Sequence, residues 1–130
     1  MRSTRQSCLR QHMEQGPILV SLSPDLDWRE TPLSSFPFTI GRHGDNMLIL
    51  RDARIKRYHA RIDRVDSGFV LIDLESTNFT HLNGLKVDIA PLKHGDLICF
   101  GGKLHFVYLE YDDPVQVRLQ HDKLNSATSP

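Results

Sequence analysis

Residues 56–80 read KRYHARIDRVDSGFVLIDLESTNFT, and this stretch decides the fold. It contains two segments with the pattern of strands, His59–Val65 and Phe69–Leu74. They are separated by Asp66-Ser67-Gly68, which is typical of a hairpin turn. Apolar and polar side chains alternate along the first segment with the period of two that indicates a half-buried strand. The stretch therefore predicts a β-hairpin with a polar cluster at each outer end.

The rest of the chain repeats this arrangement of short apolar segments and turn residues. The strands expected outside the hairpin cover residues 17–23, 36–42, 47–50, 85–89, 96–100 and 104–110. Strands that recur about every eight to twelve residues favour an all-β sandwich or barrel. We find no helical periodicity of useful length.

The length of 130 residues allows one domain. Residues 1–15 are polar and aperiodic, so we expect a flexible N-terminal arm. The domain is expected over residues 16–112, and residues 113–130 are interpreted as a largely flexible C-terminal tail.

The composition excludes several classes of function. Lys+Arg and Asp+Glu both number 16, so no global charge directs the protein to nucleic acid or to a membrane. No apolar run approaches the roughly 18 residues of a membrane span, and the two cysteines make no disulfide framework. We expect a cytoplasmic protein. Six basic residues crowd positions 51–64, which indicates either a solvated face or an anion-binding edge.

Polar clusters fall between the expected strands. They are Gly41-Arg42, Lys56-Arg57-Tyr58-His59, Ser76-Thr77-Asn78-Phe79-Thr80, Asn83-Gly84 and Leu92-Lys93-His94-Gly95-Asp96. Loops at one end of a sandwich converge, so these clusters are predicted to share one rim. A rim that carries guanidinium, ammonium, hydroxyl and amide groups is suited to binding an anion. The clusters contain no nucleophile–base pair and no metal-ligand spacing, so we expect no catalytic residue, no metal and no cofactor.

The order and spacing of these clusters across residues 36–110 resemble the forkhead-associated (FHA) domain, a phosphothreonine-binding β-sandwich. The family pattern is Gly-Arg, Ser-Arg/Lys-x-His, Ser-Thr-Asn-Gly-Thr, Asn-Gly and His-Gly-Asp. The resemblance implies two mostly antiparallel sheets with the ligand site in loops at one end. The chain departs from the pattern twice: Lys56 stands where the family has Ser, and Phe79 stands where it has Gly.

The resemblance assigns phosphopeptide contacts to five residues. Arg42 is expected to make the main phosphate contact, since its guanidinium presents a planar fork of donors. Lys56 keeps the amide of the family's Ser and replaces the hydroxyl with a flexible cation, and Arg57 is expected to contact the phosphate or the ligand backbone. Thr77 is expected to contact the phosphate through its hydroxyl. Asn78 is expected to hold the peptide backbone.

Four further residues are expected to support the site. Gly41 precedes the main arginine, and His59 is expected to brace the loop that carries residues 56 and 57. Asn83 and Gly84 are interpreted as a hairpin turn whose Asn side chain ties neighbouring loops. For the loop residues around position 78, an Asx or ST turn that satisfies its own backbone stays open as an alternative.

Two functions remain open at this point. The first is a non-enzymatic adaptor that binds phosphothreonine peptides in Ser/Thr kinase signalling. The second is a degenerate FHA fold that binds partners, or assembles, without phosphate; Lys56 and Phe79 motivate it. In either case we expect a monomer or a weak homo-oligomer.

Overall fold

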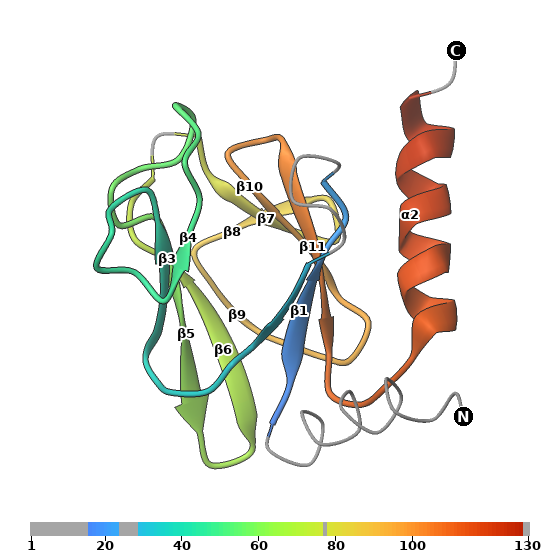
Figure 1. Cartoon of the computed structure of the whole chain (residues 1–130), viewed down its shortest axis with the longest axis horizontal. Coiled ribbons are helices and arrows are strands. Elements are labelled where there is room, and N and C mark those ends of the chain that lie inside the picture. Colours follow the sequence, from blue (N-terminus) through green and yellow to red (C-terminus); the bar gives the residue numbers. More distant parts are fainter. Residues whose placement is uncertain (1–15, 24–28, 77, 129–130) are drawn as a thin grey trace.

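The computed structural model describes residues 16–23, 29–76 and 78–128, which form two β-sheets packed face to face and one helix outside them (Figure 1). One sheet contains, in spatial order, β2 (Glu30–Pro32), β1 (Ile18–Ser21), β11 (Leu104–Leu109), β10 (Leu97–Phe100), β7 (Thr80–Leu82) and β8 (Leu85–Val87). The other contains β4 (Leu48–Ile49), β3 (Phe38–Gly41), β5 (Ala60–Val65), β6 (Gly68–Asp73) and β9 (Ile89–Pro91). Only β3 and β4 pair in parallel among these strands. The predicted sandwich of two mostly antiparallel sheets is confirmed, and the expected arm over residues 1–15 lies outside the described residues.

The predicted hairpin is formed by β5 and β6, whose register runs from Ala60 opposite Asp73 to Val65 opposite Gly68. Ala60 and Ile62 are buried against the other sheet, whereas the side chains between them lie on the outer face. The period of two therefore places one face of β5 in the core, as the sequence indicates.

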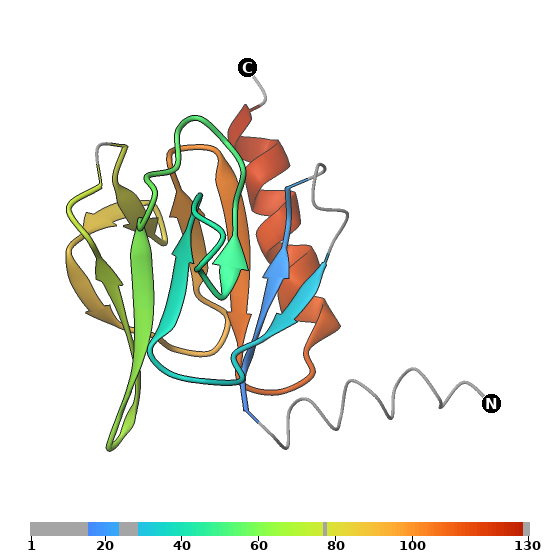
Figure 2. The same ribbon diagram turned by 60° about the vertical axis from the view of Figure 1, so that its left-hand side comes forward.

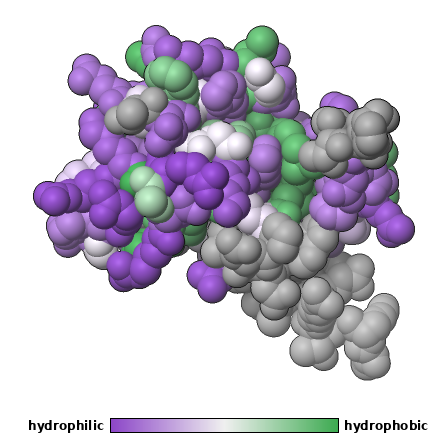
Figure 3. All heavy atoms as spheres, turned by 90° about the horizontal axis from the view of Figure 1, so that it is seen from above, coloured by the Kyte–Doolittle hydropathy of each residue, from purple (hydrophilic) through white to green (hydrophobic). Residues whose placement is uncertain are grey.

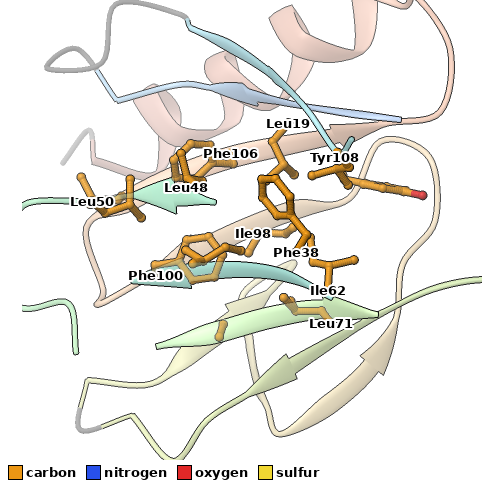
Figure 4. Packing of buried hydrophobic residues seen from close by; sticks show 14 of the residues in the cluster. Leu19, Phe38, Leu48, Leu50, Ile62, Leu71, Ile98, Phe100, Phe106 and Tyr108 are labelled. Carbon is orange, nitrogen blue, oxygen red and sulfur yellow. The ribbon is translucent and has the colours of Figure 1, made fainter. Parts of the chain in front are cut away.

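The core between the sheets is made of large aliphatic and aromatic side chains from both layers. Figure 4 shows them facing one another, with Leu19, Ile98, Phe100, Phe106 and Tyr108 from the first sheet and Phe38, Ile62 and Leu71 from the second. Each of these side chains is at most 1% exposed. Full burial of one such side chain contributes roughly 1.5–3 kcal/mol, so this core fixes the two sheets and the loops between them.

Strands β1 and β11 are buried on both faces. Their outward side chains Ile18, Val20, Val107 and Leu109 form a second apolar cluster, against which Leu97, Val117 and Leu124 pack. Two of these residues belong to the helix α2 (Pro114–Thr128), which lies along the outer face of the first sheet (Figures 1 and 2). A sheet covered on both sides needs apolar side chains on both sides, which explains why hydrophobic residues follow one another directly at positions 18–20 of β1 and 106–109 of β11.

Helix α2 corrects the interpretation of residues 113–130 as a largely flexible tail. The Asp113 carboxylate accepts a hydrogen bond from the Gln116 N–H at 3.2 Å, so it caps the helix in front of Pro114. The buried side chain of Gln120 donates to the carbonyl of Gly95 at 2.8 Å, which ties the helix to the sandwich. This helix is neither long nor apolar enough to cross a membrane.

The structure also divides one expected strand. Residues 85–89 were expected to be continuous, but β8 belongs to the first sheet and β9 to the second. Asp88 lies at the crossing, where its carbonyl accepts a hydrogen bond from the N–H of Asp73 at 2.8 Å. Strands β2 and β7 form outside the expected strands, because short strands at or near a sheet edge carry little periodicity of their own.

Candidate functional site

Three loops meet at one end of the sandwich, which we call the rim (Figures 1 and 2). Residues 42–47 follow β3, residues 50–59 follow β4, and residues 74–79 follow β6. The N–H of Arg42 donates to the carbonyl of Lys56 at 3.0 Å and so joins the first two loops. Seen from above in Figure 3, the described surface at this end is mainly hydrophilic.

Gly41 is required because the first two loops approach each other so closely. A Cβ at this position would overlap the carbonyl oxygen of Arg57, and it would lie 2.9 Å from the side-chain nitrogen of Asn46. That same nitrogen donates to the carbonyls of His43 at 2.8 Å and Arg57 at 2.9 Å. Only glycine at position 41 therefore allows Asn46 to clamp the two loops together.

Arg42, which is expected to make the main phosphate contact, is exposed at the rim, and a backbone carbonyl orients its side chain. Its Nε–H donates to the carbonyl of Ile55 at 3.0 Å. The two terminal NH₂ groups then remain available to an incoming anion. An arginine oriented in this way loses less side-chain freedom on binding.

Arg42 lines an open pocket together with Arg57 and Arg51, and with His43 and Gly44. No acidic residue lines this pocket, and none of its three arginines forms an ion pair within the described residues. The pocket therefore concentrates positive charge, although the formal net charge of the chain is zero. Sequence reasoning named Arg42 and Arg57 but left Arg51 in a general basic stretch, since nothing in the sequence shows which of its arginines meet.

Lys56 lies at the rim, but its polar groups are engaged within the protein. Its ammonium donates to the carbonyls of Leu74 at 3.1 Å and Glu75 at 3.2 Å. Its backbone N–H donates to Nδ1 of His59 at 3.1 Å. Lys56 thus connects the 50–59 loop to the 74–79 loop.

His59 is completely buried and connects the same two loops from below. Because Nδ1 accepts from the N–H of Lys56, the proton lies on Nε2, which donates to the carbonyl of Phe79 at 3.3 Å. Burial lowers the pKa of His59, and the hydrogen bond to Phe79 opposes this only in part. The ring is therefore neutral at pH 7 and acts as a brace.

The start of the 74–79 loop is shaped by Asp73, which sequence reasoning missed. The Asp73 carboxylate accepts hydrogen bonds from the Ser76 hydroxyl at 2.5 Å, the Ser76 N–H at 3.0 Å and the Thr80 hydroxyl at 2.8 Å. Burial raises the pKa of Asp73, but these hydrogen bonds outweigh it and the pKa is lowered overall. An Asp at a strand end, followed by hydroxyl residues three and seven positions later, is the signal that was available.

Asn78 lies on the exposed side of the same loop, and its side-chain amide donates to the carbonyl of Arg54 at 3.0 Å. The side-chain oxygen stays available to a ligand N–H. The expected contribution of Thr77 lies outside the described residues.

Phe79 adopts a left-handed backbone conformation, with φ of 61°. This conformation costs a non-glycine residue roughly 1–2 kcal/mol. The carbonyl of Phe79 is held by the N–H of Gly101 at 3.2 Å as well as by His59. The ring is 42% exposed, and the ammonium of Lys86 lies 4.0 Å from its centroid, a cation–π contact.

Asn83 and Gly84 form the turn between β7 and β8, at the end of β7 away from Thr80. The Asn83 side chain donates to the carboxylate of Asp96 at 3.0 Å and accepts from the N–H of Leu97 at 2.9 Å. The turn thus ties two neighbouring loops together, but the structure does not bring it to the rim.

The described rim presents three arginines around an open pocket and the side-chain amide of Asn78 on a neighbouring loop, and hydrogen bonds to backbone carbonyls join these loops. This arrangement can bind an anion with attached polypeptide backbone.

Comparison with known proteins agrees with this geometry. A family model described as the FHA domain matches residues 38–101. The glycogen accumulation regulator GarA of Mycobacterium tuberculosis is 36% identical over 69 residues, which are 53% of this chain and 42% of that protein. The chain therefore matches less than half the length of that relative.

Solved structures share the fold. An FHA domain described for phosphothreonine-dependent interactions superposes with a TM-score of 0.67 and 28% identity, covering 75% of this chain and 99% of that domain. The FhaA FHA domain, solved with the intracellular domain of Rv3910, has a TM-score of 0.63 and 29% identity, covering 71% and 98%. The match over residues 38–101, together with the shared sandwich, shows that this chain contains a forkhead-associated domain.

Proposed function

We propose that this protein is a phosphothreonine-peptide-binding adaptor module in Ser/Thr kinase signalling. The observation that carries the proposal is the position of Arg42: its Nε–H donates to a backbone carbonyl, and the residue lines a pocket that no acidic residue of the described chain lines. A phosphate group carries about −1.5 to −2 charges at pH 7 and three acceptor oxygens, which match such donors.

The relatives support the proposal through what their descriptions state. One solved FHA domain is described for phosphothreonine-dependent interactions, and another was solved with the intracellular domain of a partner protein. GarA is named a regulator.

We assign Arg42 and Arg57 to the phosphate and Asn78 to the peptide backbone. The side-chain nitrogen of Asn78 donates a hydrogen bond to the carbonyl of Arg54, so the side-chain oxygen of Asn78 is the atom that accepts from a peptide N–H. Thr77, from its place between Ser76 and Asn78, supplies a hydroxyl to the phosphate. Gly41 and His59 hold the loops, and Lys56 acts as a link between loops more than as a phosphate ligand.

The proposed module works by binding and has no catalytic role. Its partner is a phosphothreonine protein, neither nucleic acid nor a membrane, since the chain has no net charge and the positive charge that it does concentrate lies in one pocket lined by three arginines. We place it in the cytoplasm, where Ser/Thr kinase substrates occur, as a monomer or weak homo-oligomer.

A peptide-library titration tests the proposal. Oriented phosphothreonine, phosphoserine and unphosphorylated libraries are titrated with the protein, and every hit is repeated with Arg42→Ala. We expect binding to phosphothreonine peptides only, and its loss in the variant. Equal binding of the unphosphorylated library would refute the proposal.

A phospho-independent interaction module is the second candidate, and Phe79 favours it. Its exposed ring is retained in a backbone conformation that disfavours phenylalanine, which suggests a use at the surface. Under this alternative, partner binding survives phosphatase treatment and Arg42→Ala, and is lost in Phe79→Ala.

A further inference from the structure

We infer that Arg51 is a third phosphate-binding arginine of the rim, an assignment that rests on the proposed function. The first step is the pocket itself. Arg51 lines it from the 50–59 loop, opposite the loop that carries Arg42 and together with Arg57. Three guanidinium groups that share one pocket repel one another unless an anion lies between them.

The second step is the contrast with the other arginines near Arg51. Arg54 forms an ion pair with Asp52 at 3.2 Å, and Arg61 forms one with Asp63 at 3.0 Å. Neither Arg54 nor Arg61 lines the pocket. Within the described part of the chain, the arginines of the pocket thus have no internal carboxylate, whereas these neighbours do.

The third step concerns Lys56, the other cation expected at the phosphate. Its ammonium donates hydrogen bonds to two carbonyls of the 74–79 loop, and its backbone N–H donates a hydrogen bond to His59. The charge that Lys56 does not deliver to the pocket is supplied by Arg51, whose side chain makes no hydrogen bond or ion pair within the described residues.

The consequence is a site suited to a dianion with three terminal oxygens. Each guanidinium offers a planar fork, and three forks around one group require oxygens that point in different directions. A carboxylate is planar and carries one charge, so an aspartate or glutamate in the peptide does not replace phosphothreonine here.

A pair of charge-matched variants tests the assignment. A fluorescent phosphothreonine peptide selected from the library is titrated by anisotropy against wild type, Arg51→Gln and Arg54→Gln. Both variants lose one positive charge from the same loop, but only Arg51 lines the pocket. We expect Arg51→Gln to weaken binding on the order of tenfold, as for loss of one charged hydrogen bond. We expect Arg54→Gln to change binding by less than about twofold. Arg51→Lys should fall between wild type and Arg51→Gln, because it keeps the charge without the fork.

The outcomes separate the two levels of the argument. Equal weakening in Arg51→Gln and Arg54→Gln, or no weakening in either, would overturn the role of Arg51 and leave the proposed function standing. A folded wild type that binds no phosphothreonine peptide would refute the proposed function and this inference together. A direct readout is the Nε–H signal of Arg51 in NMR spectra, which should shift with the peptide and stay in place with its aspartate analogue.

Discussion

Replacing Lys56 with methionine tests whether the rim is held together by its ammonium group. Methionine is similar in length but cannot donate the hydrogen bonds to the carbonyls of Leu74 and Glu75. Buried charged hydrogen bonds contribute roughly 1.5–3 kcal/mol each, but Lys56 is exposed and exposed charge interactions contribute about 0.2–1 kcal/mol. We therefore expect a loss of about 1 kcal/mol in the free energy of unfolding, which lowers Tm by roughly 4 °C for a domain of this size.

The local effect is more diagnostic than the global one. Hydrogen exchange of the amides of residues 75–79 should accelerate about fivefold, the equivalent of about 1 kcal/mol, while the β5–β6 hairpin stays protected. The matched control is Lys93→Met, since Lys93 is exposed and its side chain makes no hydrogen bond or ion pair in the described structure. If both variants unfold at the same midpoint and residues 75–79 exchange as in wild type, Lys56 is not the link and the reasoning is refuted.

Three further predictions follow from the same structure. Gly41→Ala should destabilise the fold by about 1–3 kcal/mol and weaken phosphopeptide binding, because the added Cβ would overlap the carbonyl oxygen of Arg57. Calorimetry measures the stability and peptide titration measures the binding. A variant with unchanged stability and binding would contradict the close approach of the two loops. The imidazole of His59 should titrate by NMR below the ordinary pKa of about 6.5. Because the unfolded state then binds more protons, His59 makes stability fall as pH drops below about 6.5, and a ring that titrates at or above that value would rule this out. Deleting residues 114–130 should lower the free energy of unfolding by about 3 kcal/mol or more, because the apolar cluster around Val107 becomes exposed. The same exposure should make the truncated protein self-associate. A truncated protein that is equally stable and monodisperse would disprove this.

Much of the fold was predictable because its signals are local. The alternation along β5 and the turn before β6 predict the hairpin without knowledge of the rest of the chain. Helix α2 was missed because its apolar side chains are few and its stability comes from packing on the first sheet. A usable signal lay elsewhere: the consecutive hydrophobic residues at positions 18–20 of β1 and 106–109 of β11 indicate strands covered on both faces.

The sequence indicates which residue types lie at the rim, but it does not indicate their geometry. The resemblance named Arg42 and Asn78, both of which lie at the rim. It did not show that Lys56 turns toward loop carbonyls, or that Arg51 meets the other arginines, because both depend on how two distant loops approach each other. The positive φ of Phe79 follows from its place in the motif, and the structure shows that the chain keeps the backbone shape despite the side chain.

The acceptors that join the rim loops have a consequence for how this site can change. Arg42, Lys56 and Asn78 bond to the main-chain oxygens of positions 54, 55, 74 and 75. Every amino acid supplies that oxygen, so the exposed position 54 tolerates sequence variation while the framework persists. Position 75 is more restricted, because Glu75 has a left-handed backbone with φ of 57°. The side chain at position 54 is thereby decoupled from the integrity of the scaffold. A library randomised at position 54 should yield mostly folded proteins that still bind phosphopeptides, which makes this position a tolerant one for directed evolution of the rim.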